Sequence, residues 1–321
     1  MAHRIGILGL GEMGERMLRR MKEHPAFAVV AAWDPAPEAA EALRRLQPAA
    51  RWAGDDAALA GDPAIDCVYI ATPPAHHLAA AHLAFDHGKA VFSEAPLAID
   101  RDAARAAVER AERERHRAAV NFPFAAAPAL RALASGLRSG QLGALERVEI
   151  EIGLTGWPLP GREAGRWLAG REQGGFVREV ASHYVFLTQL LVGPLRLGQC
   201  RVDYPPDGRS AETAITASLD AGAVPVSLTG RVGGEVADRD RWVLTGANGA
   251  FALHDRYGLK RRINGTWLDI DFGEGAPLCQ REYRAQLDAL DAMLAGRPHA
   301  LPSLREALGV QECVEAMLAQ G

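Results

Sequence analysis

Three glycines near the start of the chain have the spacing of a dinucleotide-binding turn. Gly9, Gly11 and Gly14 form a complete G-x-G-x-x-G, which follows the buried-strand pattern of residues 4–8 and opens a helical pattern. In such a turn the first glycine permits the tight bend, the second lets the backbone approach a pyrophosphate, and the third lets the helix lie close to the strand. The helix N-terminus then offers free N–H groups and a partial positive charge to the anion.

An acid stands where this motif requires one. Residues 27–33 have the pattern of a second strand, and Asp34 follows it, 20 residues after Gly14. A carboxylate at about this separation accepts hydrogen bonds from the adenosine ribose. Because Asp34 would repel a 2′-phosphate, we expect NAD(H) to be favoured over NADP(H). The alternative interpretation is that Asp34, followed by Pro35, only caps the next helix.

Length and composition restrict the class of protein. The 321 residues are enough for two domains, and 48% of them are hydrophobic, which is ample for a core. A net charge of −4 gives no reason to expect nucleic acid or an anionic membrane as a partner. The sequence has no C-x-x-C and no histidine cluster with ligand spacing, so we predict no metal site and expect buried thiols in a reducing compartment. No apolar run reaches the roughly 18 residues of a membrane span, and the first apolar stretch is a strand broken by glycines, so we expect a cytoplasmic protein.

The first 122 residues alternate between strand and helix patterns. Strands are predicted at residues 4–8, 27–33, 51–52, 66–71, 90–93 and 118–122. Helices are predicted between them, at about 37–46, 76–87 and 101–117. Alternation with short loops is typical of a parallel sheet covered by helices on both faces.

The pattern changes beyond residue 122. Strands are predicted at residues 145–154, 211–219, 224–232, 241–245, 250–253 and 267–272. Helices are predicted at about 127–138, 175–192, 280–294 and 303–318. Long strands joined by glycine-rich turns indicate a largely antiparallel sheet.

We therefore predict an α/β protein of two domains. Residues 1–122 form a dinucleotide-binding Rossmann domain with a doubly wound parallel sheet. Residues 123–321 form a substrate-binding and oligomerisation domain of the α+β class, with a large open, mainly antiparallel sheet, and its C-terminal helices can pack back on the first domain. Ligands of such parallel sheets bind beyond the carboxyl ends of the strands, so we expect the second domain to roof that edge.

Four motifs in order resemble those of the Gfo/Idh/MocA oxidoreductases, relatives of glucose-fructose oxidoreductase and inositol dehydrogenase. Besides the glycine turn, residues 71–77 match T-P-x-x-x-H, residues 88–97 match G-K-x-V-x-x-E-K-P-L at all but one position, and residues 174–183 are similar to G-G-x-x-x-D-x-x-x-H. The resemblance implies a Rossmann domain followed by a domain with a large open mixed sheet, which often forms the dimer interface.

This resemblance also implies the cofactor contacts and the partners. The residues expected to bind the dinucleotide are Gly9, Gly11, Glu12, Met13, Gly14, Asp34, Thr72, Pro73, His77 and Glu94. The expected partners are a small-molecule substrate and further copies of the chain in a homodimer or homotetramer, with no nucleic acid and no membrane.

Two residues of the fourth motif could perform acid–base chemistry. Glu179 and His183 are four positions apart, which places them on one helical face. An imidazole, with an unperturbed pKa of roughly 6.5, suits proton transfer at neutral pH. Because the resemblance implies that this face points at the nicotinamide, we predict that His183 is the catalytic acid/base and that Glu179 orients it or binds a substrate hydroxyl. The alternative is a purely structural Glu–His pair.

The departures from the family pattern leave the chemistry open. Ala95 replaces the lysine that in family members helps to polarise the reacting hydroxyl, Glu179 replaces an aspartate, and residues 121–124 lack an arginine often found there. We predict an NAD(P)-dependent oxidoreductase that transfers hydride to or from a CH–OH/C=O group of a sugar or polyol derivative, or to a C=N bond. The alternatives are a non-catalytic dinucleotide-binding regulator and an NAD-assisted hydrolase or lyase.

The Gly/Pro-rich stretch 156–174 holds weaker candidates. Trp157 and Trp167 could stack on a sugar ring, although packing in a core or interface is at least as consistent with the sequence. Arg162, Arg166 and Arg171 could bind a carboxylate or phosphate, or remain solvated.

Overall fold

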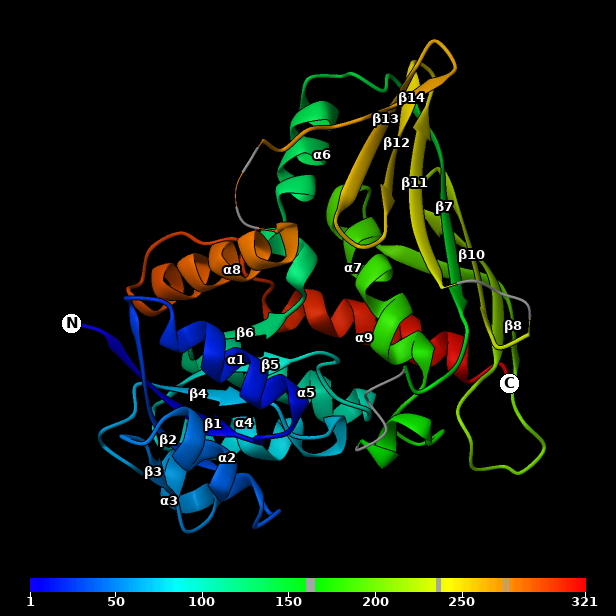
Figure 1. The fold of residues 1–321 in the computed structure, drawn as a ribbon. Coiled ribbons are helices and arrows are strands. Elements are labelled where there is room, and N and C mark those ends of the chain that lie inside the picture. The colour runs from blue at the N-terminus through cyan, green and yellow to red at the C-terminus, as the bar shows by residue number, and fades with distance from the viewer. Residues whose placement is uncertain (160–164, 235–237, 274, 276) are drawn as a thin grey trace. The chain divides into compact units, whose positions relative to one another are not determined.

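The computed structural model describes residues 1–159, 165–234, 238–273, 275 and 277–321. It divides into two compact units (Figure 1). The first unit comprises Met1–Phe122 and Tyr283–Leu308, and the second comprises Pro123–Glu282 and Gly309–Gly321. The chain therefore leaves the first unit after residue 122, returns to it at residue 283, and ends in the second.

The first unit is built on a six-stranded sheet with the order β3-β2-β1-β4-β5-β6. Every neighbouring pair in it is parallel. Its strands are β1 (His3–Leu8), β2 (Phe27–Trp33), β3 (Arg51–Trp52), β4 (Cys67–Ile70), β5 (Ala90–Glu94) and β6 (Ala118–Asn121). This order reverses between β1 and β4 and is that of the doubly wound nucleotide-binding fold, which confirms the predicted class.

Helices join these strands. They are α1 (Glu12–Lys22), α2 (Ala39–Leu46), α3 (Asp56–Ala60), the 3₁₀ turn η1 (Pro74–His76) with α4 (His77–Asp86), and α5 (Arg101–Glu114). The sequence patterns missed the short α3, which the side chain of Asp55 caps by accepting from the N–H of Ala58. Helix α8 (Leu278–Leu294) adds Leu287, Leu290 and Met293 to the same hydrophobic core as β1 and β4, which explains why the chain returns to this unit.

The second unit is built on an eight-stranded sheet with the order β14-β13-β12-β11-β7-β10-β9-β8. Only β7 and β10 pair in parallel among the described strands, so the sheet is mainly antiparallel, as predicted. Its strands are β7 (Leu145–Leu154), β8 (Leu195–Asp203), β9 (Ala214–Ala221), β10 (Val224–Val232), β11 (Arg239–Gly246), β12 (Gly249–His254), β13 (Gly258–Ile263) and β14 (Thr266–Asp269).

One face of this sheet is buried and the other is polar. Along β9 the residues alternate strictly between buried and exposed, and Ile150, Leu228 and Trp242 are among the fully buried side chains of the strands. The remaining elements are η2 (Pro123–Ala126), α6 (Pro128–Arg138), η3 (Arg166–Ala169), the π-helical η4 (Val177–Ala181), α7 (Ser182–Leu191) and α9 (Leu304–Leu318).

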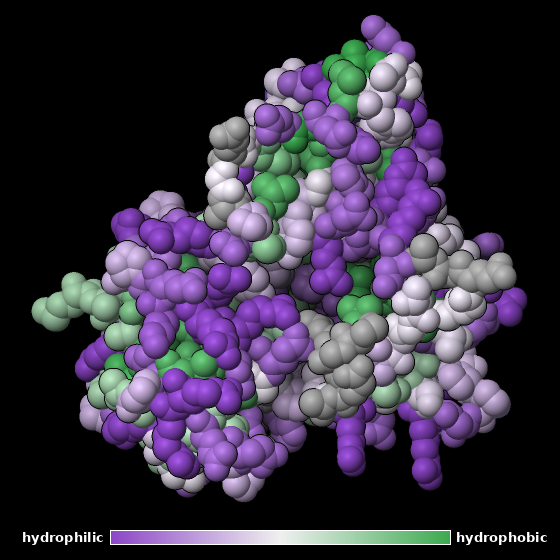
Figure 2. Space-filling view, in the orientation of Figure 1, coloured by the Kyte–Doolittle hydropathy of each residue, from purple (hydrophilic) through white to green (hydrophobic). Residues whose placement is uncertain are grey.

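The view of the surface and the apolarity of the described helices can be compared with what the sequence composition predicts. Hydrophilic residues predominate over the helices of the first unit that face the viewer in the space-filling view (Figure 2). Across the described parts of the chain, no helix combines the length and the apolarity needed to cross a bilayer.

Candidate dinucleotide site and acid–base helix

Each glycine of the turn after β1 occupies a distinct environment. Gly9 has φ +88°, and a Cβ there would lie 2.5 Å from the carbonyl oxygen of Ala71. A Cβ at Gly14 would lie 2.0 Å from the carbonyl oxygen of Gly9, so α1 packs directly on the turn. At Gly11, by contrast, a Cβ would meet no atom within 4 Å. The fold itself requires Gly9 and Gly14, whereas Gly11 leaves the open space over the backbone that a pyrophosphate needs.

The N-terminus of α1 faces this turn. Gly11 is the N-cap residue and supplies no side-chain cap to the first-turn amides of Glu12, Met13 and Gly14. The carboxylate of Glu12 pairs with Arg16 one turn further along the helix. An α-helix N-terminus without a side-chain cap attracts an anion through its amides and its dipole. The residues present therefore fit a dinucleotide pyrophosphate.

Asp34 joins the end of β2 to the glycine turn. Its Oδ2 accepts from the N–H of Leu10 at 2.7 Å, and its Oδ1 accepts from the N–H of Ala36 at 2.8 Å. It does not cap α2, whose N-cap is Glu38. An ionised carboxylate has about four acceptor sites, so a carboxylate fixed in this way keeps capacity for ribose hydroxyls. Residues 35–38 include no cation that could bind a 2′-phosphate.

His77 links the loops that follow β4 and β5. The side chain is 2% exposed, with Nε2 2.7 Å from the carbonyl oxygen of Thr72 and Nδ1 2.8 Å from that of Pro96. Burial lowers the pKa of His77. Thr72 and Pro73 are half-buried on the first of these loops. The imidazole thus has a structural role in shaping the stretch expected to contact the cofactor.

Glu94 ends β5 and belongs to a network of polar side chains. Its Oε1 accepts from Asn121 Nδ2 at 2.8 Å and from the hydroxyl of Tyr69. Asn121 in turn accepts from Gln286 on α8. Burial and the neighbouring Glu94 raise the pKa of Tyr69 well above its ordinary value. The network holds Glu94 at the carboxyl edge of the sheet, beside the half-buried Ala95, whose methyl group can neither donate nor accept a proton.

The sequence pattern did not predict that Tyr69, Asn121 and Gln286 belong to the network around Glu94. Tyr69 lies in an apolar run that reads simply as a buried strand, and Gln286 lies on a helix far along the chain. The one available signal was the presence of polar residues among apolar neighbours in a predicted strand and helix.

Glu179 and His183 lie in the second unit, on a helix that is not uniform. The sequence predicted one α-helix over residues 175–192, but η4 is π-helical and α7 continues from it as an α-helix. Both side chains are half-buried, whereas Val180 and Ala181 between them are buried. The ring of Phe124 meets that of His183 edge-on, with centroids 6.0 Å apart. π-Helical turns occur frequently at functional sites.

Glu212 fixes the first turn of this helix. Its side chain is 2% exposed, and its Oε1 accepts from the N–H of Val177 at 2.7 Å. Gly175 precedes the helix with φ +101°, and a Cβ there would lie 2.3 Å from Glu212 Oε2. Burial raises the pKa of Glu212. The second glycine of the fourth motif is therefore required by the carboxylate, a partner that sequence spacing did not reveal.

Arg178 anchors the same helix by a second buried contact. Its guanidinium is bidentate to Glu315 of α9, with Nε–Oε1 at 2.6 Å and Nη2–Oε2 at 2.9 Å. Its Nη1 donates to the carbonyl oxygens of Arg171 and Gly174, both at 2.9 Å. These contacts and that of Glu212 hold the segment bearing Glu179 from two sides.

The described residues of the Gly/Pro-rich stretch make contacts within their own unit. Trp157 Nε1 donates to the carbonyl oxygen of Leu168 at 2.7 Å, and Arg171 donates to that of Gly321 at 2.8 Å. Trp167 is half-buried and Arg166 is exposed, while Arg162 lies outside the described residues.

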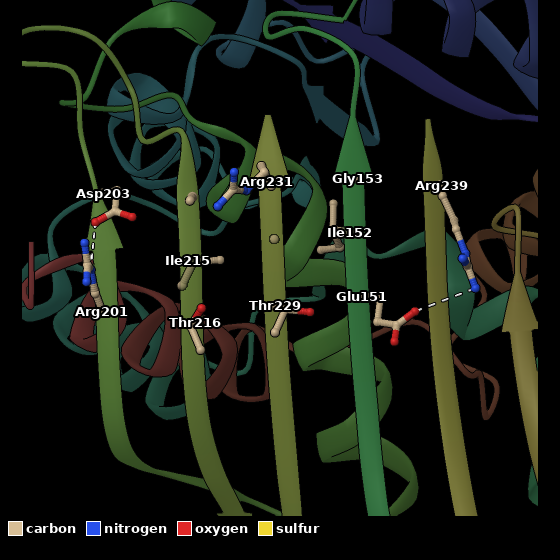
Figure 3. Close-up of a pocket in the computed structure, with 12 residues that line it drawn as sticks. Glu151, Ile152, Gly153, Arg201, Asp203, Ile215, Thr216, Thr229, Arg231 and Arg239 are labelled. Carbon is tan, nitrogen blue, oxygen red and sulfur yellow. Dashed lines mark hydrogen bonds and ion pairs between the residues drawn. The ribbon is translucent and has the colours of Figure 1, made fainter. Parts of the chain in front are cut away.

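A polar groove of about 690 Å³ lies on the outer face of the sheet in the second unit (Figure 3). Thr216 and Thr229 line it together with two ion pairs, Glu151–Arg239 at 3.7 Å and Arg201–Asp203 at 2.9 Å. None of the residues predicted from the sequence to be functional lines this groove. Among the described residues, no cluster of three or more histidines, cysteines and acids is arranged to hold a metal ion.

Comparison with known proteins identifies the first unit. The model of the oxidoreductase family with an NAD-binding Rossmann fold, GFO_IDH_MocA, matches residues 3–122. Residues 3–122 belong to the Gfo/Idh/MocA oxidoreductase family. The glycine turn, Asp34, the loop of Thr72 and the strand end at Glu94 all lie within this matched region.

Curated relatives match only part of the chain. Glycosyl hydrolase family 109 protein 1 of Bacteroides thetaiotaomicron is 37% identical over 108 residues, which cover 31% of this chain and 23% of that protein. The NAD⁺-dependent scyllo-inositol 2-dehydrogenase of Bacillus subtilis is 32% identical over 108 residues, which cover 33% of this chain and 32% of that protein. The chain therefore matches about a quarter to a third of the length of these relatives.

The fold extends over the whole chain. A 3-ketoreductase from Actinomadura kijaniata, solved with NADP and TDP-benzene, superposes with a TM-score of 0.84. The match covers 100% of this chain and 98% of that chain at 18% sequence identity. Both units therefore share their fold with that 3-ketoreductase.

Proposed function

We propose that this chain is an NAD(H)-dependent oxidoreductase that acts on a CH–OH/C=O group of a small polar substrate, such as a sugar or polyol derivative. The observation that carries the proposal is the bond between Asp34 and the N–H of Leu10, which sets a carboxylate at the rim of the glycine turn. This carboxylate suits a free ribose 2′-hydroxyl and opposes a 2′-phosphate. Family membership and the NAD⁺-dependent relative support the same cofactor.

The reaction needs both a hydride acceptor and a proton acceptor. Bound nicotinamide would supply the hydride chemistry. His183 would take the hydroxyl proton on its imidazole during oxidation and return it during reduction. Glu179 would orient the imidazole or bind a substrate hydroxyl, and the contacts of Glu212 and Arg178 would hold both residues in place.

Ala95 narrows the acceptable substrates. Without the lysine, no ammonium at this position lowers the pKa of the reacting hydroxyl. Substrates that react readily are therefore favoured, and these include a C=N bond, whose reduction requires no alcohol to be deprotonated.

A second candidate function is NAD-assisted hydrolysis of a glycoside. It is favoured by the match to a glycosyl hydrolase family 109 protein, which is 37% identical over 108 residues. In such a reaction the dinucleotide returns to its starting redox state, so no net change in nicotinamide absorbance occurs.

The test is a substrate screen in two formats. Purified protein is mixed with NAD⁺ and a panel of polyols, sugars and sugar acids while absorbance of the reduced nicotinamide is followed, and in parallel with nitrophenyl glycosides. Reduction of NAD⁺ by a polyol or sugar would support the oxidoreductase. Release of nitrophenol without a redox change would favour the hydrolase. Cofactor binding without either reaction would favour the non-catalytic regulator.

A further inference from the structure

Helix α5 ends on an arginine in a conformation that suits glycine. Arg115 is the C-cap residue, with φ 58° and ψ 39° in the left-handed region. The N–H of His116 reaches back to the carbonyl oxygen of Ala111 at 2.9 Å, which closes the helix in the manner of a Schellman motif. Glycine adopts this conformation without steric cost, whereas a side chain adds strain. Such strain is found where a side chain serves a function.

The side chain of Arg115 lines a cavity of about 240 Å³ in the first unit. Lys89, immediately before β5, and Arg117, immediately before β6, line it as well, as do His3 and Asp66. These residues lie at the amino ends of the strands. The glycine turn follows the carboxyl end of β1, so the cavity lies at the edge of the sheet opposite the proposed dinucleotide site.

Asp66, the acid that lines this cavity, does not balance the positive charge of the other lining residues. Both oxygens of Asp66 bind the guanidinium of Arg4, at 2.6 and 3.1 Å, so its charge is compensated outside the lining. Lys89 donates to the carbonyl oxygens of Asp62 and Ile65, at 2.7 and 2.8 Å. Carbonyl groups are neutral, so these contacts position the ammonium and leave its charge in place.

The remaining basic residues of the lining differ in their partners. Arg117 donates to the carbonyl oxygen of Leu294, again a neutral group, at 2.7 Å. The two histidines of the lining face acids, His3 with Asp291 and His116 with Glu114, each at 3.0 Å. Arg115 makes no side-chain hydrogen bond or ion pair with any residue that the structure describes. Lys89, Arg115 and Arg117 thus bring three cationic charges to one small cavity.

We propose that this cavity binds a small phosphate-bearing anion, held by the guanidinium of Arg115 together with Lys89 and Arg117. A guanidinium matches the oxygens of a phosphate in a bidentate manner, and an ammonium adds a point charge. The ligand accounts for the presence of an arginine where glycine would be less strained. The proposal does not depend on the function proposed above.

The test uses calorimetric titration with inorganic phosphate in a chloride buffer of constant ionic strength. Arg115→Gly is the decisive variant, because it removes the guanidinium and also removes the strain of a side chain in the left-handed conformation. We expect saturable binding by the unchanged protein and at least tenfold weaker binding by Arg115→Gly, with an equal or higher melting temperature. The matched control is Arg113→Ala, two positions earlier on the same helix end, where an exposed arginine pairs with Glu114. It should bind within twofold of the unchanged protein.

Two further arms identify the site and the source of the anion. Gly11→Asp adds a negative charge at the glycine turn, where a Cβ would meet no atom within 4 Å, so it should leave the Arg115-dependent binding unchanged. Glycerol 3-phosphate that competes with phosphate would identify a phosphate monoester as a ligand, and failure to compete would identify the free ion. Absence of saturable binding, or equal binding by Arg115→Gly, would overturn the proposal.

Discussion

At the scale of single residues, Ala95 stands where family members have a lysine, so we assign the proposed proton transfer to His183. A methyl group cannot exchange a proton, whereas the half-buried imidazole on α7 can. In the proposed function the glycine turn and Asp34 have a separate task, which is to hold the cofactor. Changes in the two groups should therefore affect different measurements.

Replacing His183 by alanine should abolish proton transfer and spare cofactor binding. We expect kcat to fall by roughly 10²–10⁴-fold, the usual contribution of a general acid/base, with an unchanged Kd for NADH because the cofactor residues lie in the first unit. Steady-state kinetics on a substrate found in the screen provide the measurement. His87→Ala, at an exposed position after α4, is the control. Full turnover by His183→Ala would refute the assignment.

The sequence identified the residues that form local motifs and missed those that meet only in three dimensions. Gly9, Gly14 and Asp34 were assigned because their spacing along the chain reflects one turn and the next strand. Glu212 was missed because its partner, the N–H of Val177, is 35 positions away and belongs to the backbone. No pattern in the sequence encodes such a contact.

At the scale of elements, the helical segment of η4 and α7, which carries Glu179 and His183, depends on Glu212. Glu212→Ala leaves the N–H of Val177 buried without its acceptor, which should cost about 1–3 kcal/mol of stability and lower kcat by displacing η4. Glu212→Gln keeps an acceptor oxygen and should retain most of the activity. Thermal melting and kcat of both variants are compared with those of Glu172→Ala at an exposed position. Equal behaviour of the alanine and glutamine variants would show that the bond to Val177 is unimportant.

Helix α8 should make stability depend on pH through Glu282. Burial raises the pKa of Glu282 to about 8, an effect only partly offset by Tyr257 and Arg256. A carboxyl group with a raised pKa in the folded state stabilises the protein below its ordinary pKa of 4.5 and loses this contribution as pH rises towards 8. Glu282→Gln removes the titration. The melting temperature of the variant relative to the unchanged protein should therefore rise between pH 5 and pH 8. A difference that stays constant with pH would contradict this account.

Elements with a strong period were predicted well, and those without one were missed. Strands β7 and β10 have the predicted bounds because their alternation matches one buried face. Strand β8 buries few residues and its register shifts between Leu197 and Cys200, and β13 carries Lys260, Arg261 and Arg262 in succession, so neither shows clear alternation. The π-helical turn η4, which Glu212 and Glu315 contact, has no periodic signal of its own.

At the scale of the whole molecule, the strand order of the first sheet could be predicted from the sequence, whereas that of the second sheet could not. Alternation of strands and helices restricts a parallel sheet to a few topologies, so the doubly wound order could be expected. The parallel pairing of β7 with β10 inside a mainly antiparallel sheet could not, because it joins strands separated by two others in the chain. The return of residues 283–308 to the first unit places apolar side chains of α8 in the core of that unit.

The outer face of the large sheet leads us to predict a homodimer. Its groove holds cations and acids side by side, such as Arg239 with Glu151, so two copies related by a twofold axis could pair opposite charges. Arg239→Glu should weaken the dimer at least tenfold, because like charges then face each other. Light scattering coupled to size-exclusion chromatography measures the mass, and Arg45→Glu on α2 serves as the control. A monomeric unchanged protein would contradict the prediction.

A fluorescence titration with NADH and NADPH measures whether the first unit binds NADH through Asp34. We expect the unchanged protein to bind NADH at least tenfold more tightly than NADPH. Asp34→Asn should reduce that preference by roughly tenfold. The substitution removes a charged hydrogen bond to the ribose and also removes the repulsion of the 2′-phosphate. Glu38→Gln, an exposed acid four positions later, should leave it unchanged. Absence of binding in folded protein free of cofactor, or a preference unaffected by Asp34→Asn, would contradict the account.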